Sequence, residues 1–256
     1  MLNTNFIITL KKIHIFRIVK QGIFNNVIRI ANGFGNKRQC YVCEKTFYKF
    51  TKFRGGSKNQ SQFRIKLVIV GSDVDNYGRM YCGSNDRERH LFMFFDKLML
   101  WQHMKDARIL HFAPEKHLRL KISQLRPLEY VMADLYPKDR DIKKIDATAI
   151  PFSNDMFDFV IANHILEHIP DYHKALSEFY RILKPGGIAI LQTPYSRILK
   201  NNFEDEGIDS DELRLIFHGQ EGHVRTFGEH QFLKSLEEAG FILRIKNIYS
   251  IPQNLI

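Results

Sequence analysis

The chain has 256 residues, of which 44% are hydrophobic and 26% charged, the balance of an ordinary soluble globular protein. Its apolar runs fall well short of the roughly 20 residues that span a bilayer. The first apolar stretch ends at Lys11, too early for a secretory signal. The three cysteines are an odd number, which argues against a disulfide framework and favours a reducing compartment. We therefore expect a cytoplasmic protein.

The net charge of +10 is concentrated near the N-terminus. Residues 1–66 hold fourteen Lys or Arg and one acid, Glu44, whereas the rest of the chain holds 24 basic and 27 acidic residues. Such an asymmetry favours contact with a phosphate-bearing partner, either an anionic membrane face or a nucleic acid. The alternative is a solvated basic segment without a partner.

The sequence predicts two helices and one flexible connection within the first 104 residues. Residues 13–30 place apolar side chains three and four positions apart with basic residues off that stripe. This pattern predicts an amphipathic helix that packs on the main domain or lies on a membrane surface. The Gly- and Ser-containing residues 55–62 indicate a flexible connection. The strongly apolar residues 90–104 predict a buried helix.

From residue 107 onward, candidate strands and helices alternate. We expect strands at 107–112, 128–133, 157–162, 187–193 and 241–248, and helices at 115–124, 171–183 and 229–239. Short apolar strands separated by amphipathic helices are typical of a parallel sheet with helices on both faces. The polar residues 196–227 are expected to form an insertion or lid. The chain thus divides into a basic N-terminal region, 1–90, and a main domain, 91–256.

Ligands of such sheets bind at the carboxyl ends of the strands. The loop after the first main strand reads Ala113-Pro114-Glu115, without the glycines that a dinucleotide pyrophosphate requires. Asp134 follows 19 positions after Glu115 at the next strand end, and Asp146 comes in the loop after that. Carboxylates at these places suit ribose hydroxyls and an adenine amino group. Each one alone would more often be a helix-start or surface acid.

Four segments carry a family resemblance: LHFAPE at 110–115, HILEHIPD at 164–171, LKPGG at 183–187 and GQEGHVRTFGEHQFLKSLEEAGF at 219–241. Together they resemble one branch of the class I S-adenosylmethionine-dependent methyltransferases, in which a FAPE sequence replaces the glycine loop and cysteine pairs precede the catalytic domain. The resemblance covers about residues 40–245. It implies a Rossmann-like, doubly wound, mostly parallel α/β sheet with an antiparallel last strand, and S-adenosylmethionine as cofactor.

Carried over position by position, the resemblance places these residues around the cofactor: Phe112, Ala113, Pro114, Glu115, Asp134, Asp146, Ala147, Asn163 and His164. S-adenosylmethionine has no phosphate, so a small residue and a rigid proline can shape its loop. The chain lacks an Asn/Asp-Pro-Pro-Tyr/Phe motif, which disfavours methylation of a nucleobase amino group. We expect O- or N-methylation of a small molecule or glycan.

The histidines at the end of the 157–162 strand allow two interpretations. His164, Glu167 and His168 fit H-x-x-E-H, a zinc-protease signature that requires one continuous helix. The segment instead follows a strand directly and runs into Pro170, which argues against a protease. In a methyltransferase, a neutral histidine can remove the acceptor proton. The candidate bases are His164, His168 and His223, although His168 could be a core residue and His223 could only hold the lid.

The cysteines are similar to the remains of a four-cysteine zinc ribbon. Cys40-x-x-Cys43 forms one pair, but Cys82 is alone, because Arg79 stands where a fourth cysteine is expected. His90 could complete a zinc site with the three thiolates. Loss of the metal, leaving a loosely ordered basic lobe, is the alternative.

Two other functions remain open from the sequence. One is a noncatalytic relative that binds the cofactor without turnover, which the missing glycines and the incomplete cysteine set suggest. The other is an RNA-binding or RNA-modifying protein, which the basic, aromatic-containing residues 1–66 suggest. For the methyltransferase, those basic residues would bring the enzyme to the membrane periphery, close to anionic lipid-linked acceptors. The sequence does not fix the acceptor or the oligomeric state.

Overall fold

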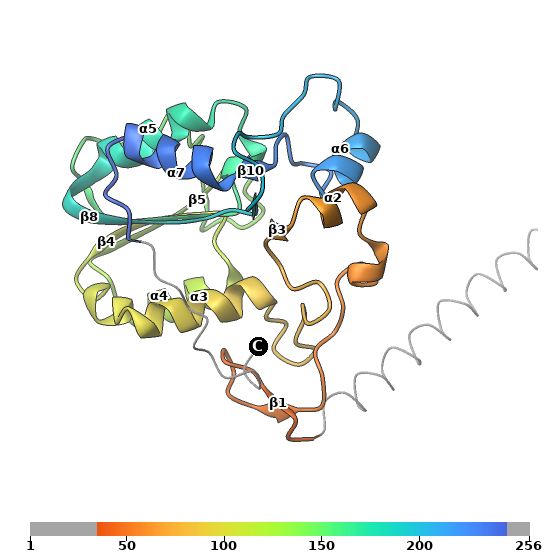
Figure 1. Ribbon diagram of the computed structural model, residues 1–256. Helices are drawn as coiled ribbons and strands as arrows, with labels where there is room; N and C mark the ends of the chain where they lie inside the picture. The colour runs from red at the N-terminus through yellow and green to blue at the C-terminus, as the bar shows by residue number, and fades with distance from the viewer. Residues whose placement is uncertain (1–34, 245–256) are drawn as a thin grey trace, which may run out of the picture.

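The computed structural model describes residues 35–244, which form a five-stranded parallel sheet covered by helices on both faces (Figure 1). The strand order is β6-β5-β4-β7-β8, and every neighbouring pair is parallel. The strands are β4 (Arg108–Phe112), β5 (Glu129–Asp134), β6 (Lys143–Lys144), β7 (Phe157–Asn163) and β8 (Leu183–Gln192). The predicted mostly parallel, Rossmann-like sheet is confirmed.

The alternation of side chains along the central strands builds two cores. On one face, Leu110 of β4 and Val160 of β7 pack with the helices α5 (Tyr172–Ile182) and α7 (Glu229–Glu238). On the other face, Ile109 and Ile161 pack with α3 (Asp86–Lys97) and α4 (Lys116–Gln124). Figure 1 shows these two helix layers on opposite sides of the sheet. Because β4 and β7 are buried on both faces, they read as continuous apolar runs.

Two predicted elements differ from the structure. The apolar segment 90–104 is not one helix: α3 begins after Asn85, which forms a capping box with Glu88, and ends at Lys97. Met99 then adopts a left-handed conformation (φ 53°), and the short 3-10 helix η2 (Leu100–His103) follows. Strand β8 begins earlier than predicted, because the Lys-Pro-Gly-Gly sequence forms a bulge within it.

The N-terminal segment and the insertion share a small sheet beside the main one. Strand β9 (Tyr195–Ser196) pairs antiparallel with β3 (Ile69–Val70) and parallel with β10 (Phe227–Gly228). The helices α2 (Gln62–Lys66) and α6 (Asp211–Phe217) lie against each other on this side of the molecule (Figure 1). The predicted insertion is therefore a folded layer built together with residues from the first part of the chain.

The remaining N-terminal elements are an antiparallel hairpin and a short helix. The hairpin consists of β1 (Arg38–Gln39) and β2 (Thr46–Phe47). The expected flexible connection at 55–62 contains the 3-10 helix η1 (Ser57–Asn59). The predicted helix at 13–30 lies outside the described residues, as does most of the predicted strand at 241–248, and residues 241–244 have no regular secondary structure. In the described part, no helix is both long and apolar enough to cross a membrane.

Candidate active site

The loop after β4 takes a glycine-like shape without glycine. Ala113 adopts a left-handed conformation (φ 45°), and its N–H donates to the carbonyl of Ala133 on β5 (2.8 Å). This conformation costs an L-residue about 1–2 kcal/mol, and alanine carries the smallest side chain that must meet that cost. Pro114 follows, and Glu115 precedes the first residue of α4. The sequence FAPE thus turns the chain sharply at the strand end.

Glu115 forms a buried network with the neighbouring strands. Its carboxylate lies 2.8 Å from Nε2 of His111 and accepts from Nδ2 of Asn163 at 3.1 Å. His111 is fully buried, and its Nδ1 lies 2.8 Å from the hydroxyl of Tyr130. Burial alone would raise the pKa of Glu115, but the hydrogen bond and charge of His111, with the hydrogen bond from Asn163, lower it overall. Glu115 is therefore an ionised carboxylate held between β4 and β7.

The two other predicted carboxylates stand at the ends of the next strands. Asp134 ends β5 and accepts from the backbone N–H of Tyr136 at 2.8 Å. Asp146 follows β6 and accepts from the backbone N–H and the hydroxyl of Thr148, both at 2.8 Å. Ala147 beside it is buried in the core. Glu115, Asp134 and Asp146 thus follow the three consecutive strands β4, β5 and β6, as the sequence order predicts.

His164 follows β7 directly, on the same sheet edge as Glu115. It adopts a left-handed conformation (φ 54°), which costs a bulky residue energy and often marks a functional position. Its Nδ1 lies 3.3 Å from Oε1 of Glu167, while its Nε2 is buried without a hydrogen-bond partner among the described residues. The neighbouring Asn163 likewise has a buried Oδ1 without a partner there. The two unpartnered atoms belong to consecutive residues at the carboxyl end of β7, the edge at which ligands of such sheets bind.

The three predicted bases gather around Glu167. Its side chain is fully buried, and Thr193 donates its hydroxyl to Oε2 at 3.0 Å. His223 places Nε2 3.8 Å from Oε1 of Glu167, and the rings of His168 and His223 stack edge to face with centroids 4.7 Å apart. Burial raises the pKa of Glu167, but the contacts with His164 and His223 lower it overall. Burial lowers the pKa of His223 to about 4, so its ring is neutral.

The sequence suggested a role for Glu167 only as a protease base. In the structure, its carboxylate lies among the three histidines. Residues 166–168 form only the short 3-10 helix η3 (Leu166–His168), and His164 lies outside it. The two histidines of the H-x-x-E-H pattern therefore do not share a continuous helix, which supports the argument against a protease. Sequence alone does not reveal the cluster, because His223 comes from the insertion and reaches Glu167 only in the folded chain.

Arg225 fastens the insertion to η3. Its buried guanidinium donates to the carbonyls of Leu166 (3.1 Å) and Pro170 (2.7 Å) and also to that of Ile169. Its Nε also donates to Glu204 at 2.8 Å. In addition, the backbone N–H of the residue before Arg225 bonds to the carbonyl of Glu167. These contacts hold His223 against Glu167.

A buried histidine beside this loop makes stability depend on pH. Burial and the charges of Arg64, Arg214 and Arg225 lower the pKa of His218 from 6.5 to about 4. Between these values the unfolded chain binds a proton that the folded chain does not, so stability falls as the pH is lowered through this window. We expect wild type to lose roughly 3 kcal/mol more than His218→Phe when acidified across it. Urea unfolding at both ends of the window measures this, and equal losses would show that folded His218 titrates normally.

The three cysteines lie together, as predicted. Among the described residues, Cys40, Cys43 and Cys82 bring their Sγ atoms within 4.8 Å of one another, and His90 is outside this group. The hydroxyl of Ser84 lies 3.4 Å from Cys40 Sγ and 3.2 Å from Cys82 Sγ. The thiols supply three of the four strong donors that a closed zinc site requires. A zinc ion here would need a fourth ligand other than His90.

Arg79 explains the missing donor. The backbone turns match: the N–H of Glu44 bonds to the carbonyl of Cys40, and the N–H of Gly83 bonds to the carbonyl of Arg79. Arg79 thus holds in the second turn the place of Cys40 in the first. Its buried guanidinium stacks 4.0 Å above the ring of Phe47. Both turns are present, and an arginine stands in the second turn at the position that Cys40 holds in the first.

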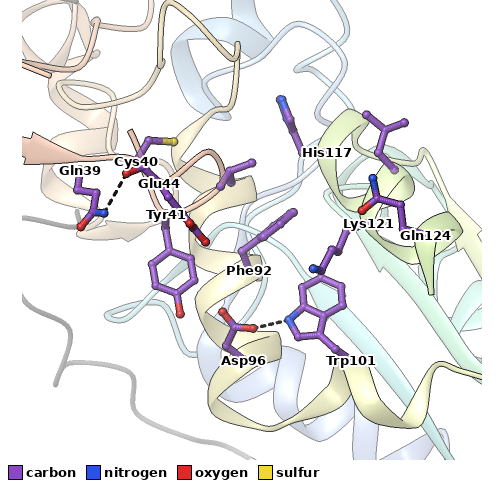
Figure 2. A pocket seen from close by; sticks show the side chains of 12 residues that line it. Gln39, Cys40, Tyr41, Glu44, Phe92, Asp96, Trp101, His117, Lys121 and Gln124 are labelled. Atoms are coloured by element: carbon purple, nitrogen blue, oxygen red, sulfur yellow. Dashed lines mark hydrogen bonds between the residues drawn. The ribbon is translucent and has the colours of Figure 1, made fainter. Parts of the chain in front are cut away.

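A cavity of about 610 Å³ lies away from the strand ends, between the first cysteine turn and the helices α3 and α4 (Figure 2). Its lining includes the aromatic residues Tyr41, Phe92 and Trp101 and the carboxylate of Asp96. Burial and the hydrogen bond with Asp96 raise the pKa of Tyr41 to about 12. This cavity contains none of Glu115, Glu167 or the histidines around it, so it is separate from the candidate active site.

Comparisons with known proteins agree with the fold. The family model described as "Methyltransferase domain" matches residues 85–244. Curated relatives include the demethylmenaquinone methyltransferases of Lactobacillus johnsonii, 37% identical over 132 residues, and of Staphylococcus carnosus, 49% identical over 45 residues. The first alignment covers 46% of this chain and 51% of the relative, and the second covers 18% and 19%. The chain therefore spans about half the length of these relatives or less.

Solved structures with a similar fold include the YcgJ protein of Bacillus subtilis, with 20% identity and a TM-score of 0.43. That alignment covers 55% of this chain and 65% of the other. A second is an S-adenosylmethionine-dependent methyltransferase of Mesorhizobium loti, with 13% identity and a TM-score of 0.40, covering 58% and 82%. The family match spans more than half of the chain and includes the whole five-stranded sheet. The chain belongs to the methyltransferase-domain family and has the class I fold that binds S-adenosylmethionine, as its resemblance to the FAPE branch predicted.

Proposed function

We propose that this protein transfers the methyl group of S-adenosylmethionine to an oxygen or nitrogen atom of a small-molecule or glycan acceptor. The observation that carries the proposal is the pairing of His164 with Glu167 at the end of β7. Nδ1 of His164 contacts the carboxylate, and Nε2 is buried without a partner in the described residues. This arrangement leaves one nitrogen free to accept a proton beside the proposed cofactor residues.

Different residues would bind the cofactor and remove the acceptor's proton. When bound, S-adenosylmethionine would supply a methyl group activated by its sulfonium charge: an acceptor lone pair would form the new bond to the methyl carbon as the carbon–sulfur bond breaks, and S-adenosylhomocysteine would leave with the electron pair. Glu115, Asp134 and Asp146 would hold the cofactor, with the remaining predicted contact residues around it. His164 accepts the acceptor's proton at Nε2, and Glu167 stabilises the resulting imidazolium through Nδ1. Alignment and proton removal are what this site provides.

Replacing His164 with alanine should abolish turnover while leaving S-adenosylmethionine affinity within about a factor of three. The reason is that the imidazole acts on the acceptor rather than on the adenosine. Calorimetric titration of the full chain with S-adenosylmethionine and S-adenosylhomocysteine gives the affinity, and a methylation screen over metabolites and glycans gives the turnover. His173→Ala, an exposed histidine on α5, is the matched control.

The titration also separates the alternatives. Failure of wild type to bind either nucleoside rejects the proposal, and binding without product in a broad screen favours a noncatalytic relative. Binding to single-stranded RNA that weakens steeply with salt would favour the RNA-binding alternative. The names of the curated relatives add a demethylated quinone as a second acceptor to include in the screen. The basic residues 1–66 would place the enzyme near anionic lipid-linked acceptors.

A further inference from the structure

We propose that Glu167, His168 and His223 bind one divalent transition-metal ion beside His164. Each of the three side chains brings a ligand atom within 4.8 Å of the other two. Glu167 and His168 belong to η3, while His223 comes from the insertion. The site is assembled from two parts of the chain that lie far apart in the sequence.

The hydrogen bonds of both histidines prepare them as ligands. Nδ1 of His168 lies 2.8 Å from the carbonyl of Gly222, and Nδ1 of His223 lies 3.3 Å from the carbonyl of His218. A carbonyl can only accept, so each Nδ1 carries the proton, and in the neutral ring each Nε2 presents a lone pair. Metal-binding histidines usually show this second-shell contact, which fixes the tautomer and the ring orientation.

The geometry around the carboxylate suits a cation between Glu167 and His223. Nε2 of His223 is 3.8 Å from Oε1 of Glu167, which is too far for a direct N–H···O hydrogen bond. With its proton on Nδ1, the His223 ring presents the Nε2 lone pair toward the carboxylate. A cation between them would accept electron pairs from both groups, and the opposite carboxylate oxygen is already held by Thr193.

Gly222 adds a steric element to the site. A side-chain Cβ at this position would lie 2.9 Å from Nδ1 and 3.1 Å from Cε1 of His168. The backbone therefore approaches the imidazole as closely as only glycine permits. This contact sets the position of the His168 ring relative to His223.

The donor set decides the class of ion. Two imidazole nitrogens and one carboxylate suit Zn²⁺, Fe²⁺, Co²⁺ or Mn²⁺, whereas Mg²⁺ and Ca²⁺ prefer oxygen alone. Three protein ligands leave coordination positions open for an acceptor oxygen. The ion would lower the pKa of that acceptor hydroxyl, and His164 would take the proton. This role rests on the proposed function, whereas the binding of the ion does not.

The arrangement differs from both metal sites considered from the sequence. In the protease pattern, His164 would be a ligand and Glu167 the base. Here Glu167 is a ligand, and His164 stays free as the base. The cysteine cluster is separate and offers sulfur, which gives a different spectroscopic signature.

Titration of the chelator-treated full chain with Co²⁺ tests the proposal. We expect one equivalent to give visible d–d bands of nitrogen and oxygen ligation without the ultraviolet thiolate charge-transfer bands that binding at the cysteines adds. His223→Ala and His168→Ala should each weaken the visible signal about 10- to 100-fold. His173→Ala and Cys43→Ser should retain it. Because His168 is half-buried, its variant provides the answer if His223→Ala does not fold.

The inference is overturned if Co²⁺ produces no visible bands, visible bands that Cys43→Ser loses, or visible bands that both histidine variants keep. Titration of the same samples with S-adenosylmethionine keeps this result separate from the proposed function. Nucleoside binding without the visible cobalt signal rejects the metal site alone. The cobalt signal without nucleoside binding retains the metal site and rejects the methyltransferase proposal.

Discussion

Replacing Glu115 with alanine should weaken S-adenosylmethionine binding by about 10- to 100-fold, since a hydrogen bond to a charged group contributes roughly 1.5–3 kcal/mol. Glu115 is ionised at the junction of β4 and β7, where an adenosine ligand would contact it. The substitution also leaves the buried His111 and Asn163 without their carboxylate partner. Calorimetric titration with S-adenosylmethionine and S-adenosylhomocysteine measures the loss.

Two variants make the Glu115 result specific. Glu115→Gln keeps a hydrogen-bonding side chain without the charge and should bind with intermediate affinity. Glu129→Ala removes a carboxylate from the other end of β5 and should bind like wild type. If Glu115→Ala left the S-adenosylmethionine affinity unchanged, the carboxylate would serve only the internal network with His111.

Replacing Arg225 with methionine should destabilise the protein by about 3 kcal/mol or more, because each buried carbonyl left without a donor costs about 1–3 kcal/mol. The guanidinium donates to three backbone carbonyls of 166–170, and methionine can donate to none. Losing the guanidinium should also release His223 from Glu167, because Arg225 anchors the segment that carries His223. Urea unfolding gives the stability, and limited proteolysis within 200–225 reports the release of the insertion.

Arg225→Lys separates charge from geometry. Lysine keeps the cation but cannot reproduce the planar fork, so we expect a loss smaller than that of methionine but well above zero. Lys234→Met, at an exposed position on α7, is the matched surface control. Wild-type stability in both Arg225 variants would show that the carbonyls of residues 166–170 have other hydrogen-bond donors.

The main sheet could be predicted from the sequence because its signal is local. The central strands β4 and β7 are mostly apolar runs of five and seven residues, and the parallel layout explains why those runs do not alternate with polar residues. The FAPE loop and the order of Glu115, Asp134 and Asp146 likewise follow from position along the chain. The bulge in β8 was not predicted, because the strand was expected to begin only at residue 187.

Pairings between distant segments could not be predicted from the sequence. Strands β3, β9 and β10 have two residues each, too few to show a periodicity. The central role of Glu167 depends on His223, which approaches only when the insertion folds back over η3. Similarly, the predicted fourth cysteine-site ligand was His90 because histidine is a common donor, whereas the structure brings Ser84 to the thiols.

The small sheet has a consequence for where this protein can be divided. The family match starts at residue 85, yet β9 within it completes its hydrogen bonding with β3, which precedes that point. The ring of Phe63 likewise covers Phe203 and Phe217 of the insertion, at centroid separations of 5.2 and 5.1 Å. A protein trimmed to the matched region would expose an unpaired strand edge and an aromatic cluster to water. The matched region is therefore smaller than the packed structural unit, and any shortened version of the protein should retain α2 and β3 so that the insertion stays covered.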